Sequence, residues 1–293
     1  METILVFRKG DRARELKKVL KAFEPQIQPR SRILVKPSLS CLEDYPATTH
    51  PETLETVLAF LLKMGKEVLV GDGPAFSNLR PQHVIDSHPL RAVCRKHGLD
   101  LLNLNRKPRR HFSFQDKRRT GLSLSAIPFS CDYVIALPVL RVHKAADIGF
   151  AGALFGQLGY VSRAGRLAAR LSRQTRDRMI ALANVAARPD LIILDAGEVL
   201  LGAETFRAGG RRAKPGVLVA GKDPVACDCF ALELLKSLGE PKVAHKRPED
   251  IGYLRAALDL QVGTKDFTVV EEEAKAPRKP RKTAPKEPSP KEP

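Results

Sequence analysis

The stretch "ATTHPETLETVLAFLLKMGKEVLVGDGP", residues 47–74, reads as one helix followed by one strand. Its apolar residues recur at the i, i+3, i+4 and i+7 positions of one helix face, at Leu54, Val57, Leu58 and Leu61. Gly65 stands where a left-handed residue commonly ends a helix, and the apolar "VLV" of a short strand follows it. A helix that leads directly into a buried strand is the repeating unit of α/β proteins.

Both ends of this unit carry polar residues. Thr49 followed by Glu52 fits a capping box, and Pro51 is tolerated in the first turn of a helix. Capping does not require His50, which is a poor cap and is therefore surplus to the local structure. The strand at the other end runs directly into Asp72, between two glycines. We expect both ends to face one pocket.

The same alternation extends along the chain. Strands are predicted near 4–7, 33–35, 68–70, 101–104, 133–137, 191–194, 217–220 and 267–270, and helices near 12–22, 52–64, 89–97, 164–187, 224–238 and 249–258. Strands such as "LIIL" and "YVIAL" are apolar throughout, as expected when both faces of a mostly parallel sheet are covered. The predicted fold class is therefore α/β: a mostly parallel sheet with helices on both faces, in one or two lobes.

The domain organisation follows from composition. Residues 1–270 are predicted to form the α/β domain, with a lobe boundary near 106–130, where polar residues interrupt the pattern. From residue 271 the chain reads "EEEAKAPRKPRKTAPKEPSPKEP". This segment has almost nothing apolar to bury, so residues 271–293 are expected to be a disordered tail.

The bulk composition is that of a soluble globular protein, with 43% hydrophobic and 28% charged residues. No secretory signal is visible, and no run approaches the roughly 20 apolar residues of a membrane span. We therefore expect a cytoplasmic protein without a membrane partner. The five cysteines are scattered and form no Cys-x-x-Cys pair, which argues against a disulfide framework and against an iron–sulfur cluster motif in this chain.

The formal net charge of +17 allows three interpretations. Basic residues concentrate in 106–119 and 163–178. They could form a solvated face, a nucleic-acid footprint, or a field that steers small anionic substrates. The absence of Trp and the 5% aromatic content disfavour nucleic-acid recognition by base stacking.

Ionisable residues follow five of the apolar runs. Ligands of parallel α/β sheets bind outside the carboxyl ends of the strands, so these residues are expected to share a pocket. They are Lys36, Asp72, Arg141 with His143, Asp195, and Asp223.

Several of these residues also have purely structural readings. Asp223 before a proline is a common helix cap. Asp228, one turn into that helix, and Asp195, directly after "LIIL", must each be paired if they are buried. His50 and His143 could bind a metal, transfer protons or simply make hydrogen bonds, whereas the other five histidines need no special account. Gly-rich "ADIGFAGALFGQLGY", residues 146–160, has glycines at close to helical spacing but contains no phosphate-binding loop.

Taken in order, these fragments resemble the domain-of-unknown-function 362 family. They are "VKPS", "TTHP", "VGDGP", "LRVH", "GALFGQLG", "ILDAG" and "GKDPVACD", spread over about residues 33–258. The resemblance implies an architecture similar to nickel-dependent lactate racemase, an α/β enzyme that uses His and Lys. Three departures stand out: Ser38 replaces the family's Asn, Arg141 replaces a Lys, and Phe155-Gly156 replaces a Lys-Asn pair. Many relatives carry a ferredoxin-like module with iron–sulfur motifs, and this chain has no such motif; if the reaction involves electron transfer, a redox partner protein must supply the electrons.

Our leading hypothesis is an enzyme, or a relic of one, of redox or isomerase type that acts on a small anionic substrate. Lys36 and Arg141 would hold the anion. His50 and His143 would transfer protons or bind a transition metal, with Asp72, Asp195 and Asp228 orienting them. The predicted site thus comprises the catalytic residues His50, His143 and Asp195 and the substrate-binding residues Lys36, Arg141, Asp72, Asp223 and Asp228. The alternative is a non-catalytic basic protein that binds nucleic acid or another polyanion.

Overall fold

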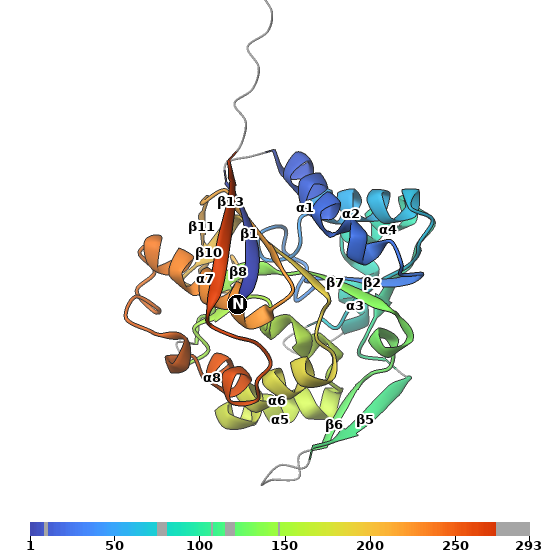
Figure 1. Ribbon diagram of the computed structural model, residues 1–293. Coiled ribbons are helices and arrows are strands. Elements are labelled where there is room, and N and C mark those ends of the chain that lie inside the picture. Colours follow the sequence, from blue (N-terminus) through green and yellow to red (C-terminus); the bar gives the residue numbers. More distant parts are fainter. Residues whose placement is uncertain (9–10, 75–80, 107, 115–120, 146, 274–293) are drawn as a thin grey trace, which may run out of the picture.

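The computed structural model describes residues 1–8, 11–74, 81–106, 108–114, 121–145 and 147–273 (Figure 1). Its strands are β1 (Glu2–Arg8), β2 (Arg32–Pro37), β3 (Glu67–Asp72), β4 (Leu101–Asn103), β5 (Arg109–Ser113), β6 (Gly121–Ser125), β7 (Tyr133–Leu137), β8 (Val139–Val142), β9 (Phe150–Ala151), β10 (Leu191–Leu201), β11 (Arg211–Ala213), β12 (Val217–Gly221) and β13 (Phe267–Glu273). Its α-helices are α1 (Arg12–Ile27), α2 (Pro51–Lys63), α3 (Pro81–Ser87), α4 (Leu90–Lys96), α5 (Arg163–Leu171), α6 (Arg173–Ala186), α7 (Pro224–Ser237) and α8 (Gly252–Asp259).

One mixed sheet organises the molecule, in the order β13-β1-β12-β10-β7-β2-β3-β4. The run β10-β7-β2-β3-β4 is parallel throughout, as is the pair β13-β1. β12 is antiparallel to both of its neighbours, β1 and β10. The predicted α/β class with a mostly parallel sheet is confirmed.

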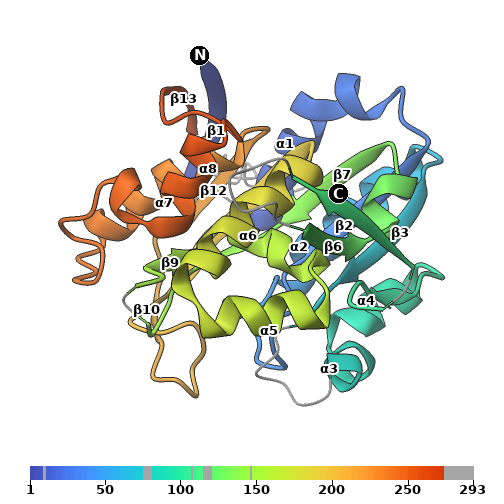
Figure 2. The same ribbon diagram turned by 90° about the horizontal axis from the view of Figure 1, so that it is seen from below.

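Helices cover both faces of this sheet, which explains why its central strands are apolar at every position. Ile33 and Val35 of β2 pack in the core formed with α1 and α2, whereas Leu34 packs on the other side with Ala183 and Leu182 of α6. α1, α2 and α4 lie on one side of the sheet in Figure 1, and α5, α6 and α8 lie on the other. In Figure 2, α5 and α6 cross in front of the sheet, with α7 and α8 beside them.

Several segments differ from what their sequence patterns suggest. The single helix expected over 164–187 is two helices, because Ser172 is extended (φ −141°, ψ 123°) and its side chain caps α6 by accepting from the Thr175 amide. The glycine-bearing segment forms β9, turns and a 3₁₀ helix at Phe155–Tyr160. β13 continues through Glu273, three residues into the predicted tail, because it pairs with β1 up to Arg8. Residues 274–293 lie outside the described part of the chain.

The segment 106–130, where a lobe boundary was predicted, contains the antiparallel hairpin β5–β6 and a short 3₁₀ helix. The hairpin contributes Leu122 and Leu124 to the core beneath α6. Within the described residues, no helix is long and apolar enough to cross a membrane.

Candidate functional site

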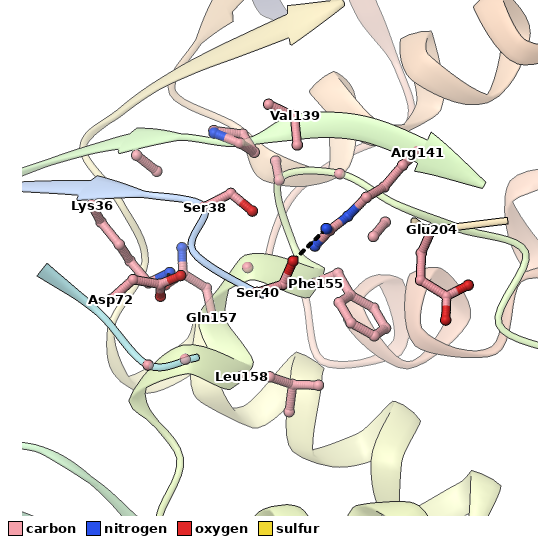
Figure 3. A pocket seen from close by; sticks show the side chains of 18 of the residues that line it. Lys36, Ser38, Ser40, Asp72, Val139, Arg141, Phe155, Gln157, Leu158 and Glu204 are labelled. Carbon is pink, nitrogen blue, oxygen red and sulfur yellow. Dashed lines mark hydrogen bonds and ion pairs between the residues drawn. The ribbon is translucent and has the colours of Figure 1, made fainter. Parts of the chain in front are cut away.

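A cavity of about 410 Å³ opens at the carboxyl ends of β2 and β3 and beside β8 (Figure 3). Its polar lining residues come from several separate segments of the chain. They include Lys36, Ser38, Ser40, Asp72, Arg141, His143, Gln157 and Glu204. The sheet therefore brings together four of the predicted site residues: Lys36, Asp72, Arg141 and His143.

Lys36 and Asp72 form a buried ion pair at one end of this cavity. Lys36 Nζ lies 2.6 Å from Asp72 Oδ1, and the Leu39 amide donates to Asp72 Oδ2 at 2.8 Å. The Lys36 ammonium also lies 5.3 Å from the centroid of the Tyr160 ring. Gly159 packs so closely here that a Cβ would overlap Asp72 Oδ1. The parallel pairing of β2 with β3 holds the two charges together.

Arg141 lies toward the other end of the cavity, where Figure 3 shows it reaching Ser40. One terminal nitrogen of its guanidinium donates to Ser40 Oγ and to the Ala47 carbonyl, both at 2.5 Å. Its Nε is buried without a hydrogen-bond partner in the described structure, and burial lowers the pKa of the group. A buried cation with an unused donor is costly unless an acceptor supplied by a ligand completes it.

His143 and Glu204 stand next to Arg141. His143 Nδ1 lies 3.5 Å from Glu204 Oε2, and the Lys144 amide donates to that same oxygen at 2.8 Å. Burial lowers the pKa of His143 to about 4, although the Glu204 carboxylate opposes the shift. The imidazole is therefore neutral at neutral pH, and its ring lies 5.5 Å from that of Phe155.

Asp228 supports the cavity from beneath. It is fully buried on α7, and its two oxygens accept from the amides of Ala153 and Leu154, at 2.6 and 3.1 Å. Gly152 and Ala153 line the cavity, so Asp228 fixes the backbone of its floor. Asp228 does not line the cavity itself. It was predicted to bind substrate, and in the structure it holds the backbone next to the cavity instead.

His50 borders a different cavity, of about 310 Å³, at the start of α2, and Asp195 accepts hydrogen bonds from Arg12 and Tyr45, which line that cavity. Asp195 accepts from Tyr45 Oη, Arg12 Nε, Thr53 Oγ1 and the Gly197 amide, at 2.7 to 3.1 Å. Its carboxylate is thus saturated by structural partners. His50 and Tyr45 line this second cavity, whereas His143 lines the first.

His50 is the helix cap of α2, contrary to the expectation that capping did not require it. Its Nδ1 accepts from the Glu52 amide at 3.1 Å. Thr49, the expected cap, instead donates to the Leu137 carbonyl at 2.7 Å and accepts from the Ser38 amide at 2.8 Å. A threonine between two strand ends ties them together, and the cap falls to the next residue.

The residues present do not fit the transition-metal site suggested by His50 and His143. The two histidines line separate cavities, and His50 uses its Nδ1 lone pair on the backbone. A metal at its Nε2 would require the proton to move to Nδ1, which would break the cap. Among the residues that the structure describes, no group of three or more His, Cys, Asp or Glu side chains is arranged to hold a metal ion.

Asp223 lies at the opposite edge of the sheet. β12 runs antiparallel, so Gly221 at its end pairs with Ile192 near the beginning of β10. Asp223 caps α7 by accepting from the Val225 and Ala226 amides at 2.7 and 3.0 Å. The capping interpretation of Asp223 is confirmed, and the structure does not bring this residue to either cavity.

Sequence reasoning missed Gln157, Glu204 and His88. Gln157 is 1% exposed and lines the first cavity, and its Oε1 has no hydrogen-bond partner among the described residues, but its segment offered no pattern beyond its glycines. Glu204 lies in a loop distant in sequence from His143. His88 had a readable signal, because "SHPL" repeats the His-Pro start of "THPE".

This chain is similar to a protein family and to a solved structure. The family model described as "Domain of unknown function (DUF362)" matches residues 33–233. No curated protein matches the sequence. Among solved structures, the lactate racemase apoprotein from Thermoanaerobacterium thermosaccharolyticum is similar, with a TM-score of 0.53 and 12% sequence identity. The similarity covers 79% of this chain and 57% of that one, so this chain spans little more than half of the racemase.

Proposed function

The chain belongs to the domain-of-unknown-function 362 family, and we propose that it is an enzyme that acts on a small carboxylate anion in the cavity between Lys36 and Arg141. The observation that carries this proposal is the buried guanidinium of Arg141, which lines a ligand-sized cavity and whose Nε has no acceptor among the described residues. A carboxylate supplies the missing acceptor and compensates the buried charge.

The charge of the cavity favours an anion. Its lining includes five cationic side chains, Lys36, Arg141, Arg166, Arg170 and Arg176, and two carboxylates, Asp72 and Glu204. Apolar residues such as Val139, Phe155 and Leu158 line the space between them. This combination suits a small organic acid with an apolar body better than it suits an inorganic ion.

The proposed chemistry is proton transfer of the isomerase type. His143 is neutral at neutral pH and can take a proton, and the nearby Glu204 carboxylate would stabilise the resulting imidazolium. The fold similarity to a lactate racemase apoprotein supports the choice of a small organic acid, while the substrate itself rests on the cavity. A redox reaction remains the second proposal for this cavity and would need a partner protein to exchange electrons.

The nucleic-acid alternative loses part of its support, because several arginines of the two basic clusters serve internal contacts. Arg166 donates to the Gly73 and Pro74 carbonyls, and Arg176 pairs with Asp147 and Asp177. Arg109 donates to the carbonyls of Ser123 and Tyr160. Part of the basic sequence clusters therefore stabilises loops through internal hydrogen bonds and ion pairs rather than forming a surface for nucleic acid.

The first test is calorimetric titration of the protein with acetate, glycolate, lactate and pyruvate. We expect saturable binding that weakens at least tenfold in Arg141→Met and in Lys36→Met, since each loses a charged hydrogen bond. Arg141→Lys, which keeps the charge, should retain part of the affinity. Lys222→Met is the matched control, because Lys222 is exposed beside Asp223 at the far edge of the sheet.

Proton transfer is tested by following deuterium incorporation beside the carboxylate of the bound acid in D₂O. His143→Gln should abolish incorporation while leaving binding within a few fold. Binding that is equal in Arg141→Met and the parent, in protein of unchanged melting temperature, would refute the anion site. Incorporation that survives in His143→Gln would refute the assignment of His143.

A further inference from the structure

We propose that the second cavity, at the start of α2, is a separate binding site for a carboxylate group, which it holds through the Nε2–H groups of His50 and His88. The cavity has a volume of about 310 Å³ and shares no lining residue with the first. His50 and His88 both line it; His50 directly precedes Pro51, the first residue of α2, and His88 directly precedes Pro89, the residue before α4.

The hydrogen bonds of the two rings determine which nitrogen carries the proton. His50 Nδ1 accepts from the Glu52 amide at 3.1 Å, and His88 Nδ1 accepts from the Leu90 amide at 3.2 Å. An imidazole nitrogen that accepts a hydrogen bond is unprotonated, so the proton of each neutral ring lies on Nε2. Burial lowers the pKa of both histidines, that of His88 to about 4, and keeps both rings neutral. Both rings belong to residues that line the cavity, and each carries its N–H donor on Nε2.

The donor of His88 is unused. His88 is 4% exposed, and within the described structure its Nε2 has no hydrogen-bond partner. A buried donor without an acceptor costs free energy comparable to a lost hydrogen bond, which an incoming oxygen would recover. The space greatly exceeds the roughly 30 Å³ that one water molecule occupies. An organic ligand with an acceptor group fits it.

The charges around the cavity favour a carboxylate over a phosphate. Arg12 is paired with Asp195 at 3.1 Å, and Arg212 with Glu198 at 3.0 Å. The charged residues of the lining are the cationic Arg12 and Arg212 and the anionic Asp44 and Glu198. With neutral histidines, the formal charge of the lining is therefore zero. Neutral N–H donors in such surroundings stabilise a single negative charge, whereas the repulsion from Asp44 and Glu198 is about twice as large for a dianion as for a monoanion.

Imidazole ¹H–¹⁵N NMR of the full chain reads this site directly. Titration with acetate should move the Nε2 resonances of His50 and His88 together, saturating in the millimolar range. Inorganic phosphate at equal ionic strength should move them at least tenfold less. Resonances that do not shift with acetate, or shift linearly without saturation, would overturn the proposal, as would equal affinity for phosphate.

Two variants separate the donor from the cap. Asn is a good helix cap, so His88→Asn and His50→Asn can still accept from the backbone amide but lose the Nε2–H donor. Each should weaken acetate binding at this site about tenfold, with the melting temperature close to that of the parent. His83→Asn is the matched control, because His83 is exposed on α3. Unchanged acetate affinity in His88→Asn would overturn the proposal. The Arg141→Met variant, which alters the first cavity, should leave acetate affinity at the second cavity unchanged.

Discussion

Buried ionisable side chains hold the backbone around both cavities. Asp195 collects four donors beside the second cavity, and Asp228 accepts two amides beneath the first. Lys36 is buried against Asp72. Because a buried charge must be paired, each such residue restricts the conformation of the loop that pairs with it. The unpaired donors of Arg141 and His88 stand out against this background, and both proposals rest on them.

Asp228 makes the stability of the fold depend on pH. Burial raises its pKa to about 7 from an ordinary value of 3.8. Between pH 4 and 7 the folded protein keeps this proton, whereas the unfolded chain has released it. The stability associated with the protonated carboxyl is therefore full below about pH 4 and is lost as the pH rises to 7. The complete shift corresponds to on the order of 4 kcal/mol.

Urea unfolding at several pH values tests this prediction. The free energy of unfolding of the parent minus that of Asp228→Asn should decrease between pH 4 and 7 by on the order of 4 kcal/mol, because Asn does not titrate. Asp266→Asn, an exposed carboxyl, controls for general charge effects. A difference between parent and Asp228→Asn that stays constant with pH would contradict the role of Asp228.

At the scale of elements, strand direction decides which polar ends meet. The carboxyl ends of β2 and β3 converge because the two strands are parallel. β12 is also a short apolar strand followed by an ionisable residue, but it is antiparallel to β10. Its carboxyl end, with Asp223, therefore lies at the opposite edge of the sheet. The 3₁₀ segment Phe155–Tyr160 then packs its glycines against the converging ends. The first cavity is thus a consequence of strand pairing and of one close approach.

That close approach predicts a strong effect of Gly159→Ala. The new methyl would overlap Asp72 Oδ1 and lie 3.1 Å from Lys36 Nζ, so the buried ion pair must move. We expect a loss of about 1–3 kcal/mol in the free energy of unfolding, and weaker carboxylate binding at the first cavity. Denaturant titration and calorimetry measure the two effects. Gly121→Ala, where a Cβ would meet nothing within 4 Å, should be neutral, and equal behaviour of the two variants would contradict this packing.

At the scale of the whole molecule, the charge of +17 is divided between interior anchors and exposed residues. Arg141 and Arg166 are buried, whereas Arg110 and Arg173 are exposed. Only exposed arginines can make contacts with a large polyanion without unfolding the loops. The buried ones act on ligands that enter a cavity.

This division predicts how generic RNA would bind. Any affinity should fall steeply with salt and should decrease in an Arg110→Ala/Arg173→Ala double variant, because fewer counterions are released. It should not change in Lys36→Met or Arg141→Met, whose cations are buried. Fluorescence anisotropy at several salt concentrations measures these slopes. An equal loss in Arg141→Met would mean that the polyanion uses the cavity, against the proposed function.

Local patterns predicted most of the elements of this fold. The stripe from Leu54 to Leu61 does form α2, and Gly65 has the left-handed φ of +71° expected after it. The all-apolar strands are buried on both faces, as their composition indicates. These features depend on neighbours within a few residues, which a sequence displays directly. The break between α5 and α6 at Ser172 was not predicted, because the helical pattern of the sequence continues across it. A single extended serine that caps the next helix does not change that pattern.

The candidate site divides along the same line. Lys36, Asp72, Arg141 and His143 could be recognised from the sequence because each follows an apolar strand, where burying an ionisable side chain costs free energy unless it is paired or functional. Contacts between distant parts of the chain place these four residues at one cavity, His50 at another, and Asp223 at the far edge of the sheet. The reason is that strand order and direction are set by pairing between residues distant in the chain. No local pattern records which way β12 runs, or which amide a buried carboxylate will meet.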